Sequence, residues 1–485
     1  MKNREDLFNL IKAMSKSEKR YFVLDAKKSG RSASRYLSLF EALGKMEEFN
    51  EEKLKKKFPK NLSSDKAYLY EAILRSMRDY RSASSKAAQV KERLMDARFL
   101  YERGLYDQST ERIAQAKVMA KELEDHFTLL EINKEEQVSL FDRRARVTLD
   151  HIKQLNTERN QTLKAIEEEL TYLDLYYRLL LEILKEFNLK DEQSIVALKN
   201  RLPLDLLDDE KKPKSPHAQR RYFLCRAVYY NLLGDLNEVY NNYQLAVNWW
   251  ESFPVIKNEN FHTYINNVYN LVNTSHKIED YSSVSEKWIS KLESEKSSLS
   301  YHNQKSIFRT LSVSNLLHLL NKGDFQKAKN ILPDIIEGIN KFGLKKSIVL
   351  ITNIAIVYFL VKDYKNCLFW CDYILKNMKK GGREDIQRLV RLYTIIAYYE
   401  IGDIDKTEAA IRAIGRYFKS SKLPKERFEY IVVNQFLKKI FNAPVSELKK
   451  EFTAFSVFLN ETRKNPGKEI PLGIDELMLW AKSKL

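Results

Sequence analysis

Apolar residues recur at helical spacing along most of the chain, and short polar interruptions divide the apolar segments into pairs. Gly234 and Asp235 form one such interruption in the stretch LLGDLNEVYNNYQLAVNWW. Leu236, Tyr243 and Ala246 then repeat on one helical face. Glycine permits a tight turn between two helices, and an aspartate side chain can accept backbone N–H bonds at the start of the second helix. The pattern predicts a helix, a turn and a second helix.

The same arrangement returns along the chain. Turns of this kind are predicted at six positions: Gly104, Gly234, Glu279, Gly323, Lys362 and Gly402. From Gly234 onward the steps between them are 45, 44, 39 and 40 residues. A period of this size indicates a repeat array, in which each helix pair buries its apolar face against the next. A further turn near residues 441–452 keeps the period, and the final segment GIDELMLWAKSKL predicts a terminal capping helix.

These copies resemble tetratricopeptide repeats, in which a small residue lets paired helices approach and an aromatic side chain fills the gap beside it. Ala227 with Tyr230, and Ala355 with Tyr358, match these positions before two of the turns. The resemblance covers roughly residues 90–460. It implies an all-α fold, an antiparallel helix-pair solenoid of the tetratricopeptide-like α-α superhelix kind, with an N-terminal helical subdomain.

The predicted organisation has three parts. They are a basic N-terminal helical subdomain at residues 1–85, tetratricopeptide-like repeats at 86–440, and a C-terminal repeat with a capping helix at 441–485. The repeats are irregular around residues 150–216. One or two unusually long helices are predicted from Asn156 to Phe187, and the prolines at positions 203, 213 and 216 then predict an exposed loop or hinge.

Charge changes the interpretation of the N-terminal part. The formal charge of the chain is +17, and residues 1–100 hold 24 Lys and Arg against 14 Asp and Glu. Such an asymmetry can mark a surface for nucleic acid or an acidic partner, although basic helical faces are often merely solvated. The segments LIKAMSKSEKRYF and FPKNLSSDKAYLYEAILRSMRDY also resemble the start of a group of uncharacterised bacterial helical-repeat proteins, which implies no activity.

A helix-turn-helix outline lies in this basic part. A first helix is predicted to end at Pro59, and Ser63 or Ser64 is expected to cap a second helix. The inner face of that second helix is predicted to be Leu69, Ile73, Met77 and Tyr80. The basic side chains that would neutralise phosphates on DNA are Lys53, Lys56, Lys57, Lys60, Arg75 and Arg78. Asp65, at the end that would read the bases, would repel phosphate.

The sequence contains no catalytic motif. The seven histidines are scattered, and phosphate-binding, dinucleotide-binding, metalloprotease and serine-hydrolase patterns are missing. The three glutamates at residues 167–169 are interpreted as the solvated face of a long helix rather than as an acid and base pair. Cys225, Cys367 and Cys371 are too few for a disulfide framework and are interpreted as small buried apolar residues. We therefore expect no enzymatic activity, no cofactor and no metal.

The longest apolar run, residues 347–361, is shorter than the roughly 18 residues that a membrane-spanning helix needs. The N-terminus lacks the unbroken apolar core of a signal peptide. The expected location is the cytoplasm, without insertion into a membrane.

One polar stripe is a candidate site for a peptide or protein partner. Four side chains fall at helical spacing on one face, with Tyr269 beside them: Asn266, Asn270, Asn273 and Lys277. The tetratricopeptide resemblance implies that this helix lines a concave groove. Asparagine there can bond both the donor and the acceptor of an extended peptide backbone. The alternative is a wetted polar face in a chain rich in asparagine.

The leading hypothesis is a non-enzymatic interaction scaffold or adaptor that binds a peptide or protein in the concave groove of the array. The clamp by which some tetratricopeptide proteins hold chaperone C-termini is not expected, because the corresponding places near Thr352 and Ile356 are not basic. The alternative is a regulator in which the basic N-terminal helices contact nucleic acid and the repeat array senses a ligand or partner.

Overall fold

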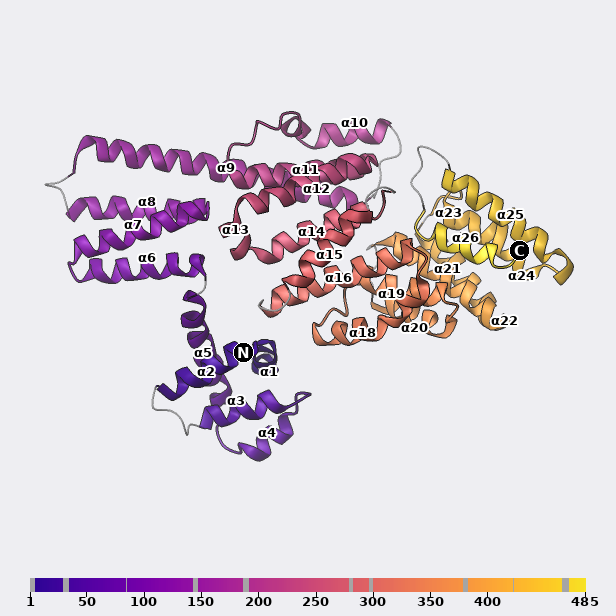
Figure 1. Cartoon of the computed structure of the whole chain (residues 1–485), viewed down its shortest axis with the longest axis horizontal. Coiled ribbons are helices and arrows are strands. Elements are labelled where there is room, and N and C mark those ends of the chain that lie inside the picture. The colour runs from indigo at the N-terminus through magenta and orange to yellow at the C-terminus, as the bar shows by residue number, and fades with distance from the viewer. Residues whose placement is uncertain are drawn as a thin grey trace.

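The computed structural model describes residues 5–28, 35–83, 85–142, 147–185, 192–278, 282–295, 300–377, 383–421, 423–464 and 471–485. Within these residues every regular element is a helix, and no strand occurs. The helices pack as neighbouring pairs, and successive pairs lie side by side along an elongated molecule (Figure 1). The prediction of an all-α chain is confirmed.

The N-terminal unit consists of five helices around a core of its own. They are α1 (Asp6–Ala13), α2 (Lys16–Lys28), α3 (Arg35–Lys45), α4 (Glu51–Lys57) and α5 (Leu62–Ser82). α5 packs against α1, α2 and α3, and its Leu69 and Ile73 are fully buried, as predicted for the inner face of this helix. Figure 1 shows α5 leading from this unit to the rest of the chain.

The turn between α4 and α5 differs from the prediction in two respects. α4 ends just before Phe58, because a residue that precedes proline is disfavoured in the helical conformation. Lys60 lies three residues beyond the end of this helix. Asn61, not Ser63 or Ser64, immediately precedes α5, and its backbone is left-handed with a φ of 57°.

Four helices then pack one against the next. They are α6 (Lys86–Glu102), α7 (Tyr106–Glu122), α8 (His126–Asp142) and α9 (Leu149–Lys185). Gly104 makes the α6–α7 turn with a φ of 75°, as predicted. Glu124 makes the α7–α8 turn with a φ of 50°, at a position for which no turn was predicted. α9 is a single helix of 37 residues, which confirms the prediction of a long helix here.

The proline-containing segment after α9 is anchored, in contrast to the exposed loop or hinge predicted from its sequence. α10 (Glu192–Arg201) is followed by a short 3-10 helix and then by α11 (Pro216–Leu233). Three leucines of the segment are buried in an apolar cluster with residues of α9 and α11: Leu202, Leu204 and Leu207. The hydroxyl groups of Tyr172 on α9 and Tyr222 on α11 donate to its backbone carbonyls, at 3.2 and 3.1 Å. Residues 208–212 remain exposed.

From α11 onward the pairs continue along the chain. They are α11 with α12 (Leu236–Ser252), α14 (Phe261–Ser275) with α15 (Ser282–Ser294), α16 (Tyr301–Asn321) with α17 (Phe325–Asn330) and α18 (Leu332–Lys341), α19 (Ile348–Leu360) with α20 (Tyr364–Asn377), and α21 (Glu384–Ile401) with α22 (Ile404–Ser420). The short α13 (Pro254–Glu259) precedes α14.

The turns between these helices follow the predicted chemistry. The glycines at positions 234, 323 and 402 are left-handed, with φ of 79°, 75° and 83°, and Lys362 adopts the same conformation with a φ of 60°. The side chains of Asp235 and Asp403 each accept a backbone N–H three residues further on, at 3.1 Å. The turn predicted at Glu279 lies outside the described residues.

The first helix of each later pair lies between its own partner and the neighbouring pairs. α14 packs against α12, α15 and α16, and α19 packs against α16, α20 and α21. Every residue from Leu350 to Val357 is buried, and so are the three cysteines, as predicted. Among the described residues, no helix combines the length and the apolar character that crossing a membrane requires.

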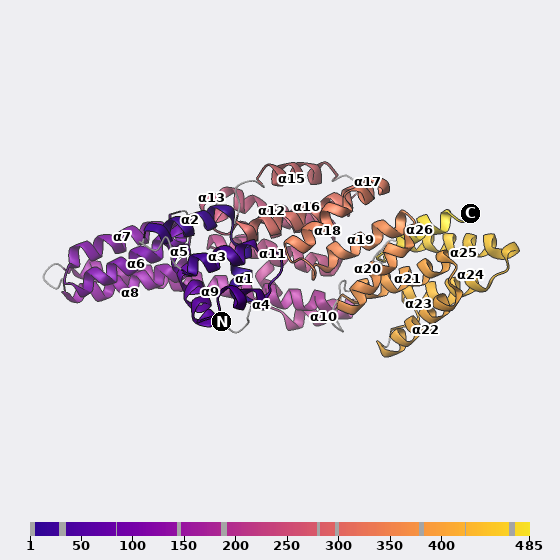
Figure 2. The same cartoon turned by 90° about the horizontal axis from the view of Figure 1, so that it is seen from below.

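The chain ends in α23 (Phe428–Ile431), a π-helical turn (Val432–Leu437), α24 (Lys438–Asn442), α25 (Val445–Lys464) and α26 (Ile474–Lys482). The α24–α25 turn lies where the period predicts one. α26, at the position of the predicted capping helix, packs against α25 and α19, and its Trp480 indole N–H donates to Glu400 at 2.8 Å. Figure 2 shows this end of the molecule opposite the end formed by α6, α7 and α8.

Candidate binding surfaces

The predicted asparagine stripe lies on α14, where this helix meets α16. Its three asparagines are half-buried, and Lys277 is exposed just beyond the end of the helix. Nη2 of Arg309 on α16 donates to Asn266 Oδ1 at 2.6 Å, and the Arg309 guanidinium carbon lies 5.2 Å from the ring centre of Tyr269. The structure therefore brings Asn266 and Tyr269 together around an arginine that the stripe pattern did not include.

Asn267, the residue next to the stripe, points toward α11 and α12 rather than toward α16. Its Oδ1 accepts the indole N–H of Trp250 at 2.8 Å and Nη1 of Arg220 at 3.5 Å. The Arg220 guanidinium carbon also lies 4.7 Å from the Trp250 ring centre, so the buried charge is held by an amide oxygen and an aromatic face. Two of the asparagines that are unusual in a helix are thus explained by bonds to α11 and α16.

Three arginines occupy one place in the repeat, fourteen residues before the turn glycines at 234, 323 and 402: Arg220, Arg309 and Arg388. Arg220 and Arg309 both bond to asparagines of α14, and Nε of Arg388 donates to Glu429 Oε1 of α23 at 2.7 Å. Sequence analysis missed these residues as links between repeats. A comparison of residues at a fixed distance from each turn would have identified them.

Asn270 and Asn273 are the members of the stripe whose hydrogen-bonding groups are unused. Neither side-chain amide bonds to a described residue, and Asn273 Oδ1 is buried. Nε2 of His276, one helical turn from Asn273, is also buried without a partner. Asn270 and Asn273 remain half-exposed, so the open parts of their side chains can meet a polar group from outside the chain.

Acidification is expected to weaken the fold around His276. Burial, together with the positive charge of His318, whose ring centre lies 6.5 Å away, lowers the pKa of His276 to about 4. A histidine whose pKa is lower in the folded state contributes stability above its unfolded pKa, and this contribution is lost as the pH falls from about 6.5 to about 4. We expect His276→Gln to reduce the stability difference between pH 7 and pH 4.5 by about 2 kcal/mol, measured by denaturant unfolding.

His151→Gln is the matched control, because His151 is exposed at the start of α9. This variant should keep the wild-type difference between the two pH values. A His276 variant with the same difference as the wild type would contradict the role assigned to burial of the imidazole.

The predicted basic residues form an exposed surface on α4, on the turn after it and on α5. None of these six side chains forms an ion pair with another described residue: Lys53, Lys56, Lys57, Lys60, Arg75 and Arg78. Asp65, which was expected to repel phosphate, is paired with Arg35, whose Nε lies 2.7 Å from Asp65 Oδ2. The pairing offsets the one carboxylate that counted against an anionic partner at this end of α5.

The solvated-face interpretation of residues 167–169 is wrong for Glu169, which is 5% exposed. Successive helical residues point about 100° apart, so a helix packed on two sides cannot direct three in a row to solvent. The Glu169 carboxylate lies 2.8 Å from Nδ1 of His126 and 4.0 Å from Nη1 of Arg221, and it accepts the Ser215 hydroxyl at 3.2 Å. Its hydrogen bond raises the pKa of His126 above the ordinary value.

This carboxylate joins the starts of α8 and α11 to the middle of α9, which is a structural role. The described residues contain no group of three or more His, Cys, Asp and Glu side chains arranged to hold a metal ion.

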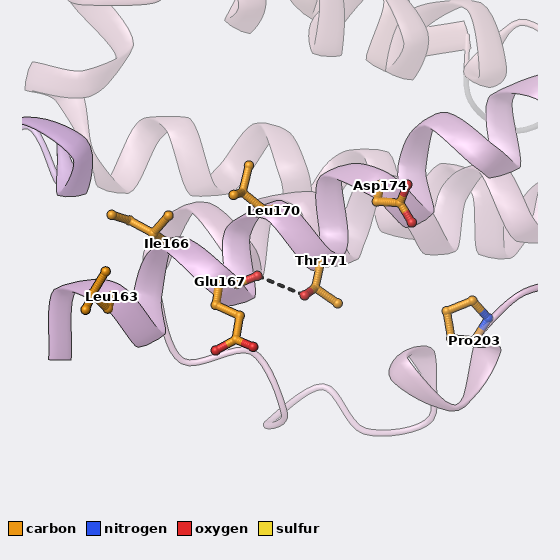
Figure 3. Close-up of a pocket in the computed structure, with 7 residues that line it drawn as sticks. All are labelled: Leu163, Ile166, Glu167, Leu170, Thr171, Asp174 and Pro203. Carbon is orange, nitrogen blue, oxygen red and sulfur yellow. Dashed lines mark hydrogen bonds between the residues drawn. The ribbon is translucent and has the colours of Figure 1, made fainter. Parts of the chain in front are cut away.

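A shallow groove lies along α9 on a face for which sequence analysis assigned no function. Its cavity of about 640 Å³ is lined by Leu163, Ile166, Glu167, Leu170, Thr171, Asp174 and Pro203 (Figure 3). Leu163 and Leu170 are 44% and 47% exposed, so the groove has an apolar floor that is open to solvent. Glu167 and Asp174 are the charged residues of its lining.

Comparison of the chain with protein-family models, with curated proteins and with solved structures finds no match. Inferences about function therefore rest on the residues of three surfaces. They are the polar stripe of α14, the basic surface of α4 and α5, and the apolar groove of α9.

Proposed function

We propose that this chain is a non-enzymatic adaptor, a tetratricopeptide-like solenoid that binds a peptide or protein segment along α14. The observation that carries the proposal is the pair of unbonded side-chain amides of Asn270 and Asn273, which lie one helical turn apart. An amide side chain offers both a donor and an acceptor, as a peptide backbone does, so two of them can fix an extended segment at two points.

The surroundings of these amides favour a preorganised surface. Arg309 holds Asn266 and lies over the Tyr269 ring, which restricts both side chains before any partner arrives. Less side-chain freedom is then lost on binding. Lys277 lies exposed at the end of the stripe.

The test is the double variant Asn270→Ala with Asn273→Ala. Proteins recovered with the tagged wild-type chain from its own cells are quantified by mass spectrometry and compared with those recovered by the variant. We expect at least a tenfold loss of the main partner, because two hydrogen bonds of about 1 kcal/mol each are removed.

Asn241→Ala is the control, because Asn241 is exposed on the neighbouring α12 and is not part of the stripe. It should recover the partner as the wild type does. If the double variant recovers as much partner as the wild type and has an unchanged circular dichroism spectrum, the proposed site is wrong.

A second candidate function is a regulator whose N-terminal helices contact nucleic acid. It is favoured by the unpaired lysines of α4 and by the pairing of Asp65 with Arg35. Charge reversal at Lys53, Lys56 and Lys57 is expected to weaken binding to duplex DNA and to reduce the slope of log affinity against log salt by about three. Fluorescence anisotropy at several salt concentrations measures both.

The control for this experiment reverses three exposed lysines at the other end of the chain, Lys439, Lys449 and Lys450, which gives the same change in net charge. If both variants bind DNA equally weakly, net charge alone explains the loss of affinity, and α4 is not part of the interface.

A further inference from the structure

α9 carries a line of exposed apolar side chains at a seven-residue spacing. Leu149, Leu163, Leu170 and Tyr177 lie seven or fourteen residues apart and are 44–65% exposed. Positions seven apart fall almost on one line of a helix, and such a line is the seam along which two helices coil around each other. Asn156 occupies the remaining position of this series.

The seam lies beside the faces that α9 uses in the fold. α9 packs against α8 and α11, and its Tyr172, Leu175 and Leu179 are buried. In a two-helix seam a second series lies three residues after the first, and here it contains Ile152, Arg159, Ile166, Leu173 and Leu180, of which Ile166 is buried. Figure 1 shows the first half of α9 along the edge of the molecule, with no described element beyond it.

The charged residues that line the groove are acidic, whereas Lys153 and Arg159 lie beside the first half of the seam. Figure 3 shows Glu167, Thr171 and Asp174 at successive positions along α9. Asp174 is paired with Arg178 at 2.7 Å on the exposed surface, whereas the Glu167 carboxylate has no ion-pair partner among the described residues. Among the described residues, none of those that line the groove is basic.

A helix of the same chain contacts the second half of α9 on its buried face. α10 is a short helix whose Leu198 is buried in the same apolar cluster as Leu175 and Leu179 of α9. Its Arg201 forms an ion pair with Glu182 of α9, with Nη2 and Oε2 at 3.0 Å. α10 therefore contacts α9 through a buried leucine and through an arginine–carboxylate pair.

The geometry points to a docking site for an amphipathic helix of a partner protein, with apolar residues at seven-residue spacing flanked by Lys or Arg, along the Leu149–Tyr177 seam of α9. A second copy of this chain is the alternative occupant, and light scattering separates it from a partner helix. The site is separate from the α14 stripe, so it would give the adaptor a second contact surface.

The test uses two labelled 18-residue peptides with the same helical pattern, one of leucine and lysine and one of leucine and glutamate. Anisotropy titrations with the purified full-length chain are expected to show at least tenfold tighter binding of the leucine–lysine peptide. Leu163→Gln with Leu170→Gln should weaken that binding at least tenfold. Glu167→Lys with Asp174→Lys should reverse the preference between the two peptides.

Phe369→Gln with Ile404→Gln is the matched control, because these residues are exposed by 61% and 73% on other helices. It should bind as the wild type does, and so should the α14 variants. The proposal is overturned if both peptides bind equally, if the α9 variants bind as tightly as the control, or if light scattering shows a dimer that the Leu163 and Leu170 changes dissociate. The seam residues are exposed, so unchanged thermal unfolding confirms that the variants fold.

Discussion

Glu169→Gln is expected to lower the free energy of unfolding by about 3 kcal/mol, since removal of one partner leaves a buried positive charge uncompensated. The wild-type carboxylate faces Nδ1 of His126 and Nη1 of Arg221 and accepts the Ser215 hydroxyl. The amide keeps the size of the side chain but not its charge. Denaturant unfolding followed by circular dichroism measures the difference.

Glu167→Gln is the matched control on the same helix. Glu167 is exposed, and surface substitutions of this kind usually change stability by less than about 0.5 kcal/mol. Similar losses in the two variants would show that the Glu169 network does not stabilise the junction of α8, α9 and α11.

Gly473→Ala is expected to cost about 3 kcal/mol at the C-terminal end, because backbone strain and overpacking both oppose the added methyl group. Gly473 has a φ of +88°, and a Cβ built on it would lie 2.1 Å from Cδ1 of Leu389. Hydrogen exchange in α26, together with thermal unfolding, reports whether this helix still packs on α19 and α25.

Gly415→Ala is expected to raise the stability of the protein instead of lowering it. Gly415 lies inside α22, and a Cβ there meets no atom within 4 Å. Alanine should therefore stabilise this helix by about 0.5–1 kcal/mol. A Gly473 variant that unfolds like the wild type would mean that α26 accommodates the methyl group by shifting.

The turns were predictable because a few adjacent residues determine them. Gly234 with Asp235, and Gly402 with Asp403, combine a left-handed backbone with a side chain that caps the next helix. The α7–α8 turn escaped prediction because Glu124, not glycine, has the left-handed conformation. The aspartate that follows it nevertheless caps α8 through the backbone N–H of Thr128 at 3.0 Å.

The buried polar contacts could not be predicted, because they depend on residues far apart in the chain. Glu169 and Glu167 are the same residue type in one charged run, yet one is buried against His126 and the other is exposed. Asn266 bonds to Arg309 and Asn267 bonds to Arg220, and each arginine lies more than forty residues away in the sequence. Helical spacing placed the stripe on one face, but it carried no information about which members were already bonded.

The α9 groove was missed for a different reason. Its apolar residues are part of a helix that also has a buried face, so a simple count of apolar positions does not separate the two. The seven-residue spacing of Leu163, Leu170 and Tyr177 is the signal that would have distinguished the exposed line.

α9 also belongs to two packing units, since it packs against α8 and against α11. Its 37 residues span about 55 Å, and an unbroken helix of this length bends little without weakening its backbone hydrogen bonds. This helix is a continuous rigid link across the irregular part of the chain. The helices before α9 and the helices after it are therefore joined through one continuous helix, and a displacement of α8 would move the end of α9 that packs against α11.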